Sequence, residues 1–210
     1  MTAMNRILSV VDRQAIADLV SEVERNTAGE LVTVVLRRSA SYAAYRIGWA
    51  TGLAWLLTAV VHLVFPDLPG LELVGAEVVL FGVLYTVLGY APILRSIVPR
   101  HARQSATADR AKRLFLELGV TETRDRSGVL IVLSELERRV EILGDRGIHE
   151  HLGAEAWNLL VVGLVASIRE GRAVEGLRRV IEQLGRELAA RFPPRPDDTN
   201  ELPNQVMIED

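Results

Sequence analysis

Three acidic residues stand where predicted strands begin or end, and together they could hold a metal ion. Glu30 and Asp125 precede two apolar runs, and Asp145 follows an alternating one. If the first two strands are parallel and the third is antiparallel to the second, these positions meet at one end of the sheet. Carboxylates with nearby carbonyl oxygens suit calcium or magnesium. The alternative is that Asp145 caps the next helix or pairs with Arg126 or Arg146.

A second candidate site is the tripeptide His149-Glu150-His151, because imidazole is a common zinc ligand. Residues two apart point to nearly opposite sides of a helix, so the histidines could share an ion only in an extended segment. Gly147 and Gly153 favour a turn and a helix start instead. We therefore interpret the tripeptide as the exposed beginning of a helix. The chain also has no G-x-S-x-G turn, phosphate loop or H-E-x-x-H motif that would indicate catalysis.

Two apolar segments interrupt the chain and predict a membrane hairpin. Ile47 to Phe65 carries no formal charge, and Val78 to Leu94 is about as long, near the ~20 residues that a spanning helix needs. A Pro- and Gly-rich stretch joins them. Apolar residues surround both segments instead of forming one stripe, which favours lipid over the alternative of two buried helices in a soluble core.

The charges around the hairpin predict its orientation. Arginines lie on the side of the soluble parts, and the loop between the spans has none; they are Arg37, Arg38, Arg46, Arg95, Arg100 and Arg103. The positive-inside rule therefore places both soluble ends in the cytoplasm of a cell with an inner membrane. His62 and Glu77 are the ionisable groups in or beside the spans, and we interpret them as interfacial anchors rather than as an ion pathway.

The remaining elements predict an α/β fold. Asp12 can cap a helix, the residues 30–37 and 128–134 read as strands buried on both faces, and Gly128 to Leu143 reads as a β-hairpin. Helical periodicity places one helix before Gly119 and two helices around Gly171. We expect a small mixed sheet flanked by helices, with the membrane hairpin inserted in the right-handed crossover between the first two strands.

Composition and domain boundaries complete this outline. The net charge of -3 argues against a nucleic-acid partner, and the absence of cysteine excludes a disulfide framework and a thiolate zinc site. We expect a split α/β domain at residues 1–40 and 101–193, a transmembrane hairpin at 41–100 and a disordered acidic tail at 194–210. The apolar segment near residues 202–208 is the part of this tail that could dock.

Several of these segments resemble a known family, the TPM domain, named for thylakoid-lumen, photosystem-repair and receptor-modulator proteins. The resemblance rests on TAGELVTVVL, on ERRVEILGDRGI followed by Trp157, on EGLRRVIEQLGRELAARFP and on DDTNELPNQV, a tail similar to that of a bacterial membrane-protein branch. It implies an αβα sandwich. Some relatives bind divalent cations, some have weak acid-phosphatase activity, and others are non-enzymatic accessory factors. The cation-associated positions carry over to Asp145 and, with fewer matching residues, to Glu30 and Asp125.

The resemblance and the anchor together predict a two-span membrane protein whose cytoplasmic domain is a non-enzymatic accessory or assembly factor. Calcium or magnesium at the acidic cluster would tune it, and its partners would be the lipid bilayer and a membrane protein. The alternative is a weak metal-dependent membrane-bound phosphatase. The commoner family plan places the domain outside the cytoplasm, whereas the arginines here place it inside, which puts a phosphatase role in doubt.

Overall fold

The computed structural model of the 210-residue chain describes residues 8–149, 154–195, 197 and 200–209. The chain divides into two compact units. One combines Met1–Ser39 with Gln104–Asp210, and the other is Ala40–Arg103. The second unit is therefore an insertion in the chain of the first.

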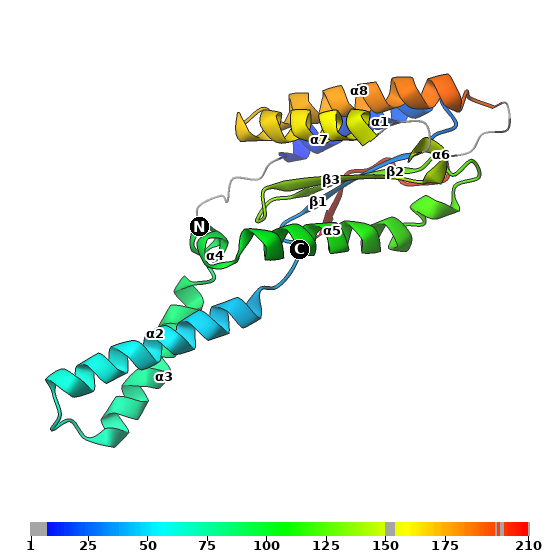
Figure 1. Ribbon diagram of the computed structural model, residues 1–210. Coiled ribbons are helices and arrows are strands. Elements are labelled where there is room, and N and C mark those ends of the chain that lie inside the picture. The colour runs from blue at the N-terminus through cyan, green and yellow to red at the C-terminus, as the bar shows by residue number, and fades with distance from the viewer. Residues whose placement is uncertain (1–7, 150–153, 196, 198–199, 210) are drawn as a thin grey trace. The chain divides into compact units, whose positions relative to one another are not determined.

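A four-stranded mixed sheet forms the centre of the first unit (Figure 1). Its strands are β1 (Leu31–Leu36), β2 (Val129–Ser134), β3 (Arg139–Gly144) and β4 (Met207–Glu209). Their order is β3-β2-β1-β4. β1 is parallel to β2 and β4, and β2 is antiparallel to β3. The predicted α/β fold with a mixed sheet, and with two apolar helices between β1 and β2, is confirmed.

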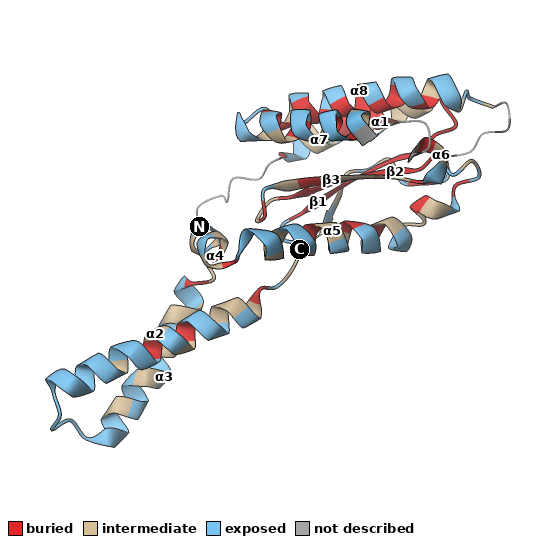
Figure 2. Cartoon of the chain, in the orientation of Figure 1, coloured by how far each residue is buried: buried red, intermediate tan, exposed pale blue. Residues whose placement is uncertain are grey.

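Helices cover both faces of this sheet (Figures 1 and 2). One face packs on α1 (Val10–Glu24), α7 (Ala154–Arg169) and α8 (Ala173–Arg191), and the other packs on α5 (Arg100–Glu117). β1 and β2 are buried along their whole length, and alternate residues feed the two separate cores. This explains why both strands read as continuous apolar runs. The shorter helices are α6 (Arg146–His149) and the 3-10 turn η1 (Val120–Glu122).

The N-terminus of α1 corrects one detail of the sequence interpretation. Ser9, and not Asp12, is the N-cap: its side chain accepts a hydrogen bond from the Asp12 N–H, and the Asp12 carboxylate accepts one from the Ser9 N–H. This reciprocal arrangement is a capping box, which places the acid at the third helical position. Both residue types are visible in the sequence, but the cap is the serine and the acid supports it.

The C-terminal tail differs from the expected disorder. β4 pairs with the edge of β1, the Arg37 N–H donates to the Glu209 carbonyl at 2.9 Å, and Leu202 is buried in the α5-side core. Glu209 also forms an ion pair with Arg110 of α5. The prolines and acids of the tail suggested disorder, but the open edge of β1 supplies backbone partners that composition does not reveal.

The second unit contains α2 (Ala43–Val64), α3 (Gly70–Val87) and α4 (Ala91–Ile97). α2 and α3 pack against each other and run in roughly opposite directions (Figure 1). The expected second span is shifted: the helix begins at Gly70 and ends at Val87, so Glu77 lies within it and not beside it. Gly89 and Pro92 then interrupt the chain before α4, because proline favours the first turn of a new helix.

Candidate functional site

The sheet register brings the three predicted acids to one end. Leu31 pairs with Val129, and Val129 pairs with Gly144. Glu30 therefore lies just before β1 and Asp145 just after β3, and Asp125 lies in the loop that leads to β2. This is the arrangement that parallel and antiparallel pairing requires.

Asp145 has contacts that fit a capped corner. It is buried, its Oδ1 accepts the Arg146 N–H at 2.7 Å, and its own N–H donates to the Gly128 carbonyl at 2.8 Å. Its Oδ2 lies 3.9 Å from Nη1 of Arg126, and within the described part of the chain it accepts no hydrogen bond. One carboxylate oxygen thus accepts a hydrogen bond from the start of α6, and the other forms a long ion pair with Arg126.

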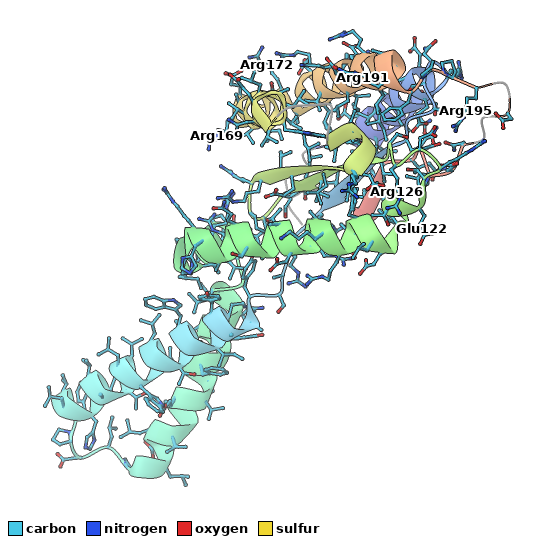
Figure 3. The ribbon with its side chains drawn as sticks, turned by 45° about the vertical axis from the view of Figure 1, so that its right-hand side comes forward. Glu122, Arg126, Arg169, Arg172, Arg191 and Arg195 are labelled. Carbon is cyan, nitrogen blue, oxygen red and sulfur yellow. The ribbon has the colours of Figure 1, made fainter. Side chains whose placement is uncertain are left out.

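The other two acids have different partners. Glu30 is buried and its Oε1 accepts the Glu201 N–H from the tail at 2.9 Å. Asp125 forms an ion pair of 2.5 Å with Arg195, beyond α8. Figure 3 shows Arg126 and Arg195 at this end of the first unit. The acids therefore gather at one end of the sheet, but each is held by its own neighbours.

The chemical type of these residues fits a hard divalent cation, but their placement does not assemble a shared site. Among residues 8–149, 154–195, 197 and 200–209, no group of three or more His, Asp or Glu side chains is placed to hold one ion. A common cation would require Asp125 to leave Arg195. The sequence thus placed the three acids at one end of the sheet and offered Arg126 as a partner of Asp145, but it did not reveal that Arg195 pairs with Asp125.

Sequence reasoning missed a fourth acid at this end, Glu24. It is the last residue of α1, and its Oε1 accepts the Leu31 N–H at 3.0 Å at the start of β1. Burial raises the pKa of Glu24 to about 8; the Leu31 hydrogen bond lowers the pKa, and repulsion from Glu30 raises it further. Glu24 and Glu30 thus form a coupled pair of acids in which Glu24 is mostly protonated at neutral pH.

The turn between α1 and β1 explains how this pair forms. The Thr27 hydroxyl donates to the Phe192 carbonyl at 2.7 Å and accepts the Gly29 N–H at 3.0 Å. This fixes the turn to the end of α8 and brings the end of α1 back toward β1. The six-residue spacing of the two acids has no meaning without this tertiary contact, so the sequence carried no usable signal for the pair.

The opposite end of the sheet carries a buried cluster of hydroxyls around one acid. The Ser39 N–H donates to Glu137 Oε1 at 3.0 Å, and the Ser134 hydroxyl donates to the other carboxylate oxygen. The Ser39 hydroxyl lies 2.9 Å from that of Ser134 and 3.2 Å from that of Thr107. All four residues are buried. Ser134, a hydroxyl that a phosphatase could have used, therefore lies in a buried structural network.

The histidine tripeptide remains only partly placed. His149 ends the short helix α6. Glu150 and His151 lie outside the described residues. The expectation that the tripeptide begins a helix is therefore not settled by the structure.

Within the second unit, the two ionisable residues of the predicted membrane segment lie together. His62 and Glu77 line one shallow pocket of about 360 Å³ with Trp55, Thr58 and two apolar residues. Both α2 and α3 are long and apolar enough to span a membrane.

Arg46, one of the arginines that flank the hairpin, is bound within the second unit. It lies in the first turn of α2, its Nη2 donates to the Tyr85 carbonyl at 2.8 Å, and its guanidinium lies 3.9 Å from the Tyr85 ring centre. It thus joins α2 to α3 at the end where the hairpin meets the rest of the chain.

Comparison with known proteins agrees with the fold. Residues 93–187 match the family model of the TPM domain, over a stretch that contains α5, β2, β3, α6, α7 and most of α8. The NMR structure of BA42 protein from the psychrophilic bacterium Bizionia argentinensis sp. nov. is similar over 100% of both chains, with a TM-score of 0.61 and 21% identity. A likeness at this identity concerns the fold alone, and it extends to β1 and β4, outside the family match. No curated protein matches the chain.

Proposed function

We propose that the chain is a membrane-anchored accessory or assembly factor, with its sheet domain on the cytoplasmic side and no turnover of its own, as in some proteins of the TPM family whose model residues 93–187 match. One observation carries the proposal: the insertion between β1 and β2 is a pair of long apolar helices that leave their surface exposed.

The exposure of this hairpin supports a membrane anchor over a buried pair of core helices and over a signal sequence. Core helices of a soluble protein are mostly buried, whereas only 11% of the apolar window of α2 and 0% of that of α3 is buried. A signal sequence precedes the folded domain, whereas α2 follows α1 and β1 of the sheet domain. In water such a surface would be an aggregation liability, and in lipid it is the expected one.

The cytoplasmic placement rests on the arginines around the hairpin. Arg37 and Arg38 precede it and Arg100 and Arg103 follow it, while the loop between α2 and α3 has no Lys or Arg. An excess of Lys and Arg in short flanking segments favours the cytoplasmic side. Arg46, which is held by Tyr85, contributes less to this bias than its position in the sequence suggested.

The non-enzymatic part of the proposal rests on how the polar groups of the first unit are used. Asp125 is paired with Arg195, Asp145 binds the start of α6, and Ser134 is buried against Glu137. A hydrolytic site needs a nucleophile and a base that can reach a substrate together. Each of these side chains is instead bound by its own neighbours in a structural role.

We further propose that the acidic end of the sheet binds calcium or magnesium weakly, through Asp145, Glu30 and Asp125. The donor types fit such an ion, and the Oδ2 atom of Asp145, which accepts no hydrogen bond from the described residues, could coordinate it. The ion would compete with Arg195 for Asp125. Arg195→Gln should therefore strengthen binding and Asp145→Asn should abolish it, as followed by amide resonances near Gly144 during calcium titration.

Two measurements on the purified full chain test the proposed function. With phosphomonoesters and either calcium or magnesium, we expect no turnover above that of Asp145→Asn, and turnover abolished by this substitution would establish the phosphatase instead. For the accessory role, we expect a membrane protein to co-purify with the chain after solubilisation. The matched control replaces residues 41–100 with an unrelated two-span hairpin. This variant keeps a membrane anchor and tests whether the partner binds the natural hairpin or the sheet domain.

A further inference from the structure

Helix α7 has an apolar surface on both sides. Trp157, Leu160 and Leu164 are buried in the core that faces the sheet. On the outer side, Leu159 is 64% exposed and Val162 is 56% exposed. Amphipathic surface helices normally present polar residues to water, so the apolar outer side is typical of a helix that binds a partner.

The outer residues follow the spacing of a helix-pairing seam. Glu155, Leu159, Val162, Ala166 and Arg169 are separated by four, three, four and three residues, and all five are exposed. This spacing keeps them on one face of a helix, as in coiled coils. Beside them, a Cβ built on Gly163 would meet no atom within 4 Å, so another helix could approach closely there.

The charges at the two ends of the seam make it self-complementary. Glu155 lies in the first turn of α7 and Arg169 in the last, where Figure 3 shows Arg169 at the end of the helix. If a second α7 runs antiparallel, Glu155 faces the partner's Arg169, Leu159 faces the partner's Ala166, and Val162 meets its own copy. A parallel arrangement would place like charges together. These charges also suit the helix dipole, but the dipole does not explain the apolar residues between them.

We propose that two copies of this chain associate through an antiparallel pairing of their α7 helices along this seam. The contact is isologous, because the same residues on both copies form it about one twofold axis. A second copy fits better than an anionic membrane surface, which would favour basic residues at both ends of the apolar stripe. The pairing adds an interface to the first unit that does not depend on the membrane hairpin.

Cysteine cross-linking tests the centre of the seam directly, because the natural chain has no cysteine. In membranes that contain the full chain, Val162→Cys should form a disulfide-linked dimer on mild oxidation. Glu187→Cys, exposed on α8, is the matched control and should give only background. Equal cross-linking of the two variants would overturn the proposal.

Charge reversal tests the antiparallel direction. Glu155→Arg or Arg169→Glu alone should weaken the association of the detergent-solubilised full chain by about tenfold, since each change affects two ion pairs per dimer. The double variant should restore it, as measured by light scattering across a dilution series. A monomer at all concentrations, or an association that neither single change weakens, would overturn the proposal and assign any remaining contact to another surface.

Discussion

Glu24 is the last residue of α1, and its half-buried carboxyl group lies beside the first residue of β1. Its Oε1 accepts the Leu31 N–H, and Glu30 lies within electrostatic reach. The pKa of Glu24 rises to about 8 from an ordinary value of 4.5, mainly because burial disfavours the charged form. Between these two pH values, Glu24 is therefore mostly protonated in the folded protein and ionised in the unfolded chain.

This protonation makes stability depend on pH. The contribution of Glu24 is complete below about pH 4.5 and is lost as the pH rises to about 8. After allowance for its partial exposure, we expect a loss of roughly 1–3 kcal/mol in the free energy of unfolding. Glu24→Gln should remove this loss because an amide keeps the acceptor for Leu31 without ionising.

Urea unfolding at several pH values measures the effect. Trp157 reports on the first unit when Trp49→Phe and Trp55→Phe remove the other tryptophans of the chain. Glu22→Gln, an exposed acid two residues earlier in α1, is the matched control and should leave the pH dependence unchanged. A wild-type stability that is flat between pH 5 and pH 8 would contradict the assignment.

The buried cluster at the other end of the sheet predicts a second residue-scale effect. Glu137→Ala removes the acceptor of the Ser39 N–H and of the Ser134 hydroxyl, both of which are buried. Leaving buried donors without an acceptor should lower the free energy of unfolding by about 2–4 kcal/mol. Glu187→Ala, an exposed acid on α8, should change it by less than about 0.5 kcal/mol in the same assay.

At this scale, the sequence revealed the positions of the acids better than their partners. Glu30, Asp125 and Asp145 were predictable at one end of the sheet because each stands at a strand end, and strand pairing fixes where strand ends meet. Glu24 was not predictable, since its neighbours come from β1 and from the contact of Thr27 with α8. Arg126 was predictable as a partner of Asp145, whereas Arg195, the partner of Asp125, was hidden because it lies in a tail without any local pattern.

At the scale of elements, the tail shows where composition misleads. Strands β1, β2 and β3 were predictable because apolar runs and alternation are local properties of the chain. β4 has three residues, and it exists because the edge of β1 offers backbone groups to pair with. The end of the second span was misjudged for a local reason, since Gly89 and Pro92 break the apolar run into α3 and α4.

The docking of the tail predicts a cost for Leu202→Ala. Leu202 is 8% exposed and packs in the core between the sheet and α5. Truncating a buried leucine should lower the free energy of unfolding by roughly 2–4 kcal/mol. Ile208→Ala, on the more exposed side of β4, should cost clearly less. If both changes had equal and negligible effects, the tail would be disordered, as its composition suggested.

For the whole molecule, hydropathy alone located the inserted hairpin, and the interleaving of strands with helices indicated the fold class. These features were predictable because they depend on long segments and on the limited ways in which strands can be connected. The position of β4, and the contact of Glu24 at the end of α1 with the start of β1, depend on residues that the local sequence pattern does not connect. They could be established only from the folded structure.

Membrane anchorage by α2 and α3 is the central claim, and flotation of carbonate-washed membranes tests it most directly. We expect the full chain to float with the lipid fraction. In the matched variant, Leu56→Arg and Val79→Arg add charges at exposed positions of α2 and α3, each costing about 2.5–3.5 kcal/mol at the centre of a span, and membrane retention should fall sharply. Release of the wild-type chain by carbonate, or identical flotation of the variant, would contradict the account.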